Sequence, residues 1–95
     1  MEWNFDQEKN VAALITKQVV EMGFPILQVI HYSDDHSWAF MCGTTSKPSD
    51  TLVVSMEQAI SFDESLHKIA TLPPGYIASR NTVNEEWVCE QVDDI

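Results

Sequence analysis

The sequence predicts a single two-layer α+β domain: a mainly antiparallel sheet of roughly four to six strands, with about two or three short helices on one face. Three observations predict this class. Short apolar segments of strand length are separated by turn-forming residues. Two Ser-x-x-Glu/Gln patterns mark the starts of short helices. A chain of 95 residues is long enough for one hydrophobic core but too short for a second domain.

The first element lies within residues 6–22 and has two interpretations. Apolar residues recur there at spacings of three and four, as on an amphipathic helix: Val11, Leu14, Ile15, Val19 and Met22. Alternatively, residues 11–16 form a short strand, and Thr16 caps a short helix over residues 17–22. In both interpretations Gly23 ends the helix, because glycine readily adopts the left-handed conformation of a helix terminus.

A β-hairpin is expected next. Residues 26–32 and 38–42 are apolar and rich in β-branched or aromatic side chains, as strands are. The residues between them, 33–37, are polar and typical of turns. A polar loop over residues 43–50 then leads to a third strand over residues 51–55.

Two short helices and two further strands complete the prediction. Capping boxes begin at Ser55 and at Ser61, so we expect two helical pieces with a bend near Ser61. In the second piece Leu66, Ile69 and Ala70 share one face, and the Pro-Pro-Gly at residues 73–75 ends it. Residues 75–80 and 86–92 are extended, with a turn over residues 81–84.

The charge of the chain excludes several classes of partner. Fifteen acidic residues face five basic ones, giving a formal net charge of −10. Such a surface repels nucleic acid and anionic lipid, so we expect neither as a partner. No apolar run approaches the roughly 20 residues that span a bilayer, and no signal peptide is evident. We therefore expect a cytoplasmic protein whose two cysteines, Cys42 and Cys89, are reduced thiols.

Several segments carry a family resemblance. They are A-x-x-T-K-x-V-x-x-x-G-x-P-I at residues 13–26, HYSDDHSWAFMCG at 31–43, FDESL at 62–66, LPPGYIASR at 72–80, and Trp87. In this order and spacing they resemble a family of small bacterial proteins, long described as a domain of unknown function and grouped with predicted immunity proteins of toxin systems. The resemblance covers residues 11–88 and treats residues 1–5 and 91–95 as tails.

The resemblance implies an α+β fold and neutralisation of a toxin by direct binding. It implies no catalytic residues, because none are established for the family. It also favours the interpretation of residues 11–22 as a strand followed by a short helix.

The polar segment at residues 31–36 offers possible metal ligands. Two histidines and the carboxylates of Asp34 and Asp35 are suitable donor types. Their spacing argues against a metal site, because ligands on a strand share a face at alternate positions and His31 and His36 flank a turn. We predict a turn whose exposed tip, Asp34, Asp35 and His36, is a candidate contact for a partner, and we predict no metal or cofactor.

A thiol-based active site is the next candidate. His31 lies on the strand that opposes Cys42, so the sequence allows a Cys–His pair. However, Trp38, Phe40 and Cys42 alternate along one strand and should share a face that belongs to the core. We predict core positions for these three residues and for Trp87, and no catalytic residue.

Arg80 and the acidic segment near the end of the chain are the remaining candidates. Arg80, the only arginine, could clamp a partner's carboxylate or form an internal salt bridge with Asp63, Glu85 or Glu86. Residues 85–94 contain five acids and no base, and Glu85 and Glu86 are candidate contacts. Such acidic segments are either simply solvated or meet a basic partner.

These observations lead to one hypothesis and two alternatives. We expect a non-enzymatic protein-binding module, similar to immunity proteins, whose acidic surface binds a basic toxin. The first alternative is a housekeeping module that assembles with itself through a sheet edge. The second is a small metal- or thiol-dependent enzyme. The sequence does not specify the oligomeric state.

Overall fold

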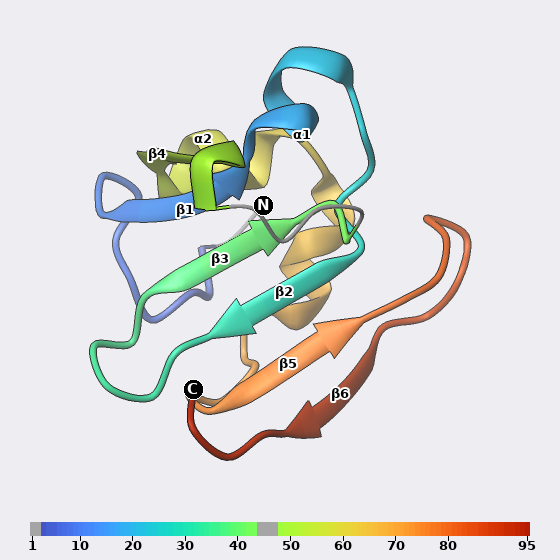
Figure 1. The fold of residues 1–95 in the computed structure, drawn as a ribbon. Coiled ribbons are helices and arrows are strands. Elements are labelled where there is room, and N and C mark those ends of the chain that lie inside the picture. The colour runs from blue at the N-terminus through green and yellow to red at the C-terminus, as the bar shows by residue number, and fades with distance from the viewer. Residues whose placement is uncertain (1–2, 44–47) are drawn as a thin grey trace.

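The predicted hairpin lies at the centre of a six-stranded sheet in the computed structural model, which describes residues 3–43 and 48–95 (Figure 1). The strands follow the order β4-β1-β3-β2-β5-β6 across the sheet. Their bounds are β1 Ala12–Thr16, β2 Gln28–His31, β3 Trp38–Met41, β4 Thr51–Ser55, β5 Tyr76–Ser79 and β6 Val88–Gln91. The helical elements are α1 Lys17–Met22, η1 Pro48–Asp50, α2 Met56–Ser61 and η2 Glu64–Ile69, with both η elements in the 3-10 conformation. The chain is thus one α+β domain with a few short helices.

The sheet is mainly antiparallel, as predicted, but it is mixed because one described pair of strands is parallel. Strand β1 runs parallel to β3, with Leu14 opposite Ala39, whereas the other described pairings are antiparallel. The parallel pair arises because the β2–β3 hairpin packs against β1 through its second strand. The connection through α1 reverses the chain, so that β2 runs antiparallel to β1 and β3 then runs parallel to it.

Residues 11–22 form a strand followed by a short helix, which was one of the two interpretations. Ala13 and Ile15 are buried at alternate positions, as a strand with one covered face requires. Gly23 ends α1 with a φ of 71°, and its N–H donates to the carbonyl of Gln18. Thr16 does not cap the helix through its side chain. Its hydroxyl instead accepts a hydrogen bond from the N–H of Cys42 at 3.2 Å.

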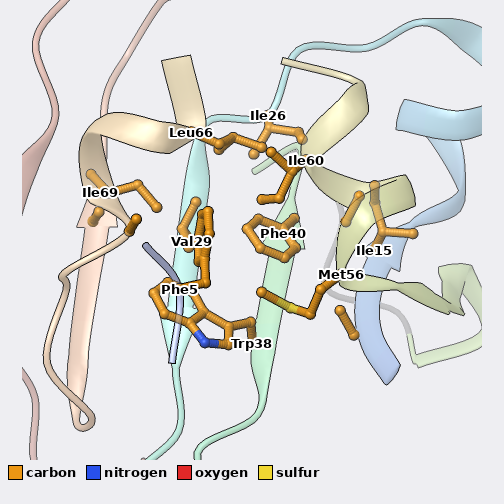
Figure 2. Close-up of a cluster of buried hydrophobic side chains, with 14 of the residues drawn as sticks. Phe5, Ile15, Ile26, Val29, Trp38, Phe40, Met56, Ile60, Leu66 and Ile69 are labelled. Atoms are coloured by element: carbon orange, nitrogen blue, oxygen red, sulfur yellow. The ribbon is translucent and has the colours of Figure 1, made fainter. Parts of the chain in front are cut away.

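The core lies between the sheet and helices α2 and η2. Figure 2 shows Ile15, Val29 and Phe40 of the sheet pointing toward residues of the helical layer. That layer contributes Met56, Ala59, Ile60, Leu66 and Ile69, all buried. Trp38, Phe40 and Cys42 are fully or almost fully buried on the same face, as predicted. Phe5 is only 7% exposed and packs edge-on against Trp38, so the segment before residue 6 contributes to the core and is not simply a tail.

The two predicted capping boxes have different outcomes. The hydroxyl of Ser55 accepts a hydrogen bond from the N–H of Gln58 at 3.1 Å and caps α2, as predicted. Ser61 is instead the last residue of α2, and its hydroxyl donates to the carbonyl of Gln58. Asp63 caps η2 in its place by accepting from the N–H of Ser65 at 2.9 Å. The bend between the helical pieces falls near Ser61, but the second cap is a different residue.

Replacement of Ser55 and of Ser61 by alanine tests whether Ser55, and not Ser61, caps a helix. A Ser55→Ala variant should lower the free energy of unfolding by about 1 kcal/mol, because the first turn of α2 loses its acceptor. A Ser61→Ala variant is the matched control and should change it by less than about 0.5 kcal/mol. Chemical denaturation measures both values. Equal losses in the two variants would contradict the assignment of the cap to Ser55.

Candidate functional site

The tip of the β2–β3 hairpin is an exposed, hydrogen-bonded turn. The N–H of Asp35 donates to the carboxylate of Asp34 at 2.8 Å, and the N–H of Ser37 donates to that of Asp35 at 3.0 Å. The hydroxyl and N–H of Ser37 together hold the pKa of Asp35 below its usual value. His36 adopts a left-handed backbone with a φ of 59°. The turn chemistry predicted for this segment is present, and its side chains face solvent.

A polar cluster beneath the hairpin contains one residue that the sequence did not indicate. The carboxylate of Asp6 accepts a hydrogen bond from the indole N–H of Trp38 at 2.8 Å. His31, only 2% exposed, stacks on the Trp38 ring with the ring centroids 4.0 Å apart. Its Nε2 lies 3.0 Å from Asp6 in a close polar contact that is not a well-aligned hydrogen bond, and its Nδ1 lies 2.7 Å from the carbonyl of Leu72. Asp6 therefore ties the segment before β1 to the hairpin.

The position of Asp6 could not be read from a motif. A buried tryptophan needs an acceptor for its N–H, but the acceptor of Trp38 is 32 residues away in the sequence. The one signal in the sequence is local. Trp3 and Phe5 alternate with Asn4 and Asp6, which is typical of an extended segment with one apolar face.

The hairpin separates His31 from Cys42. His31 pairs with Trp38 at one end of the hairpin, whereas Cys42 follows Met41, which pairs with Gln28 at the other end. His31 and Cys42 therefore lie at opposite ends of the hairpin. No group of three or more His, Cys, Asp or Glu residues that could hold a metal ion is found among residues 3–43 and 48–95.

Arg80 is buried, and its donors are used inside the protein. Its side chain is 2% exposed, and its Nη2 lies 2.6 Å from the carboxylate of Asp63. The same guanidinium donates to the carbonyl of Ile26 through two nitrogens and to the hydroxyl of Ser65. Its plane lies against the Trp87 ring, 4.0 Å from the centroid. The structure thus agrees with the internal salt bridge to Asp63, one of the two interpretations, and places the guanidinium out of reach of a partner.

The contacts with Ser65 and Arg80 lower the pKa of the Asp63 carboxyl group. Partial burial on its own would raise the pKa, but hydrogen bonds from Ser65 and Arg80, together with the charge of Arg80, hold the pKa of Asp63 below its ordinary value. Ser65 contributes both its hydroxyl and its N–H to this effect. The ionised form of Asp63 is therefore part of the folded structure, and its protonation opposes folding.

The acidic segment lies along strand β6 at one edge of the sheet. Glu85 and Glu86 are exposed in the connection between β5 and β6, and every residue of β6 is exposed. The strand is fixed by its pairing with β5, and beyond it the N–H of Val92 donates to the carbonyl of Gly75 at 2.9 Å. Ser33 also bonds to the carbonyl of Ile95. The segment expected as a C-terminal tail is therefore attached to the sheet at several points.

The face of the sheet opposite α2 and η2 has an apolar row that crosses the strands. Figure 1 views this face, with α2 and η2 behind the sheet. The registers align Val53 of β4 with Leu14, Ala39, Ile30 and Ile77 of the following strands, and Ile77 with Glu90 of β6. Leu14, Ile30 and Ile77 are partly exposed, whereas Ala39, in the middle of the row, is fully buried. This row, named here the open-face row, therefore runs from an apolar edge to an acidic one.

Comparisons of the chain with protein-family models, with curated proteins and with solved structures find no match. The resemblance to predicted immunity proteins therefore depends on the residues quoted for it. In the described residues, no helix has the length and apolar character needed to cross a membrane.

An Asp63→Asn variant tests the buried ion pair through its pH dependence. At pH 7 it should lower the free energy of unfolding by roughly 2–3 kcal/mol, somewhat less than the full cost of breaking a buried pair, because Asp63 is 22% exposed. The folded-state pKa of Asp63 is depressed, so the wild type has this extra stability above the unfolded pKa of about 4 and loses it as the pH falls through the folded value. The difference between wild type and variant should shrink below about pH 4.

The exposed pair Lys9–Glu57, with N and O 3.9 Å apart, supplies the matched control. A Glu57→Gln variant should change the free energy of unfolding by less than about 0.5 kcal/mol at pH 7. Urea denaturation across the pH range measures all three proteins. A difference between wild type and Asp63→Asn that stays constant down to pH 2 would contradict the role assigned to the Asp63 carboxylate.

Proposed function

We propose that this chain is a non-enzymatic protein-binding module that binds and neutralises a basic toxin, as immunity proteins do. The observation that carries the proposal is the open-face row, an apolar strip that ends at the acidic strand β6 and over which the described residues place no helix. Protein interfaces commonly combine an apolar centre with a charged rim. A toxin with apolar residues beside lysine or arginine fits such a surface.

The distribution of charge supports a basic partner. Glu85, Glu86 and Glu90 are exposed near the β6 end of the row, and residues 81–95 contain no base. Two of the basic side chains are committed elsewhere, because Lys9 pairs with Glu57 and Arg80 is buried against Asp63. Complementary charge of this kind accelerates association and selects against acidic partners.

The positions of the polar groups support binding over catalysis. Cys42 is 1% exposed within the core, and His31 is buried between Trp38 and the carbonyl of Leu72. A nucleophile or general base has to reach its substrate, and neither side chain does so in this fold. The exposed hairpin tip, Asp34, Asp35 and His36, extends the acidic surface and is a second contact region under the proposal.

Calorimetric titration with basic toxin domains encoded beside the gene tests the proposal. The wild type should bind one of them tighter than about 1 µM, equivalent to roughly −8 kcal/mol. A double variant, Glu86→Lys with Glu90→Lys, should weaken binding at least about tenfold, mainly through slower association, because attraction becomes repulsion. If no candidate binds the wild type tighter than about micromolar, the proposal fails.

The matched control is a Glu64→Lys variant, which reverses an exposed acid in η2 of the helical layer. It should change the affinity by less than about twofold at 0.15 M salt, since charges separated by more than a Debye length are screened. A further variant, Asp34→Lys with Asp35→Lys, tests the hairpin tip. Unchanged affinity in that variant would restrict the interface to the β6 side of the sheet.

A further inference from the structure

Strand β4, at the opposite edge of the sheet from β6, has the features of a strand that pairs with another strand. Its outer side has no neighbouring strand among the described residues. Residues 51–55 contain no charge and no proline, so none of the usual devices that block pairing at a sheet edge is present within the strand. Val53, at its centre, is 69% exposed, the highest value among the large hydrophobic side chains described.

The hydrogen-bonding pattern shows which backbone groups of β4 face outward. The N–H of Met56 donates to the carbonyl of Val11 at 2.8 Å, so residue 56 faces β1. Backbone groups alternate in direction along an antiparallel strand, and therefore Leu52 and Val54 also bond toward β1. The N–H and carbonyl of Val53 consequently point away from the sheet. Among the described residues this donor and acceptor have no partner strand, and they lie beside an exposed apolar side chain.

The charge distribution favours a second copy of the chain as the occupant. A neutral strand offers nothing to attract a basic partner, whereas it fits an equally neutral strand. Asp50 precedes the strand and Glu57, which pairs with Lys9, follows it. The acidic residues near β6 lie five strand positions away, which is roughly 24 Å at the usual spacing. That separation exceeds the Debye length of about 8 Å at physiological salt, so the acidic ends of two copies add little repulsion. Strand β6 carries Glu90 and is disfavoured for self-pairing.

We propose that two copies associate through β4 in an antiparallel pair related by a two-fold axis at Val53. A two-fold axis requires a strand to pair with itself in the antiparallel sense. In this register Val53 of one copy exchanges backbone hydrogen bonds with Val53 of the other, and both side chains pack together on the open face. The two sheets become continuous, with an acidic β6 edge at each far end. The assembly does not depend on the proposed function and leaves the β6 surfaces exposed.

Light scattering during gel filtration tests the proposal. The wild type should have the mass of a dimer at about 100 µM, and a Val53→Lys variant should weaken association at least about tenfold. The matched control is Val88→Lys, which places the same charge on the other edge strand at a residue of similar exposure, 64%. The control should remain dimeric. A monomeric wild type, or equal loss in both lysine variants, would overturn the proposal.

Disulfide cross-linking gives a second readout that does not depend on the folding of the lysine variant. A Val53→Cys variant in a Cys89→Ser background should form a covalent dimer under a mild oxidant, because two Val53 positions meet at the axis. A Val88→Cys variant in the same background should not. Faster cross-linking at residue 88 than at residue 53 would also overturn the proposal. Both experiments use the chain without a toxin, so their outcome is separate from that of the binding titration.

Discussion

The buried guanidinium of Arg80 is the interaction on which the arrangement of the layers depends. It joins the backbone at Ile26 before β2, Asp63 and Ser65 at the start of η2, and the Trp87 ring before β6. A charge removed from water is tolerated only when its donors are satisfied. The helical layer and the connection leading to β6 are therefore fixed to the sheet by one side chain, which is also the only arginine of the chain.

Because Arg80 is buried, its positive charge does not offset the acidic residues at the surface, and the two edges of the sheet differ in charge. Acidic residues gather at the β6 edge, whereas strand β4 itself contains no charged residue. The apolar open-face row connects the two edges. The same six strands thus offer one end suited to a basic partner and another suited to strand pairing. The two proposed contacts use different physical forces, charge complementarity at β6 and backbone hydrogen bonding at β4.

Local chemistry explains which parts of the fold were predictable. The alternation of side chains along a strand predicts core positions for Trp38, Phe40 and Cys42, and the Ser-x-x-Gln pattern predicts the cap at Ser55. The parallel pairing of β1 with β3 was missed because it depends on which hairpin strand meets β1, and no local pattern records that choice. The sequence pattern predicts the second cap at Ser61, whereas Asp63 is the residue that caps η2. Asp63 is equally suited to capping, and its carboxylate also pairs with an arginine that is distant in the sequence, which no local pattern records. Asp6 was missed for the same reason, since its partners are remote in the sequence.

A double-mutant cycle on Arg80 and Asp63 tests the central claim most directly. The single variants Arg80→Met and Asp63→Asn and the double variant are compared with the wild type by denaturant unfolding. If the guanidinium and carboxylate form the clamp between sheet and helices, the coupling energy should exceed about 1.5 kcal/mol, because each single variant leaves a buried polar group without its partner. Additive effects, with a coupling energy within about 0.3 kcal/mol of zero, would contradict the account.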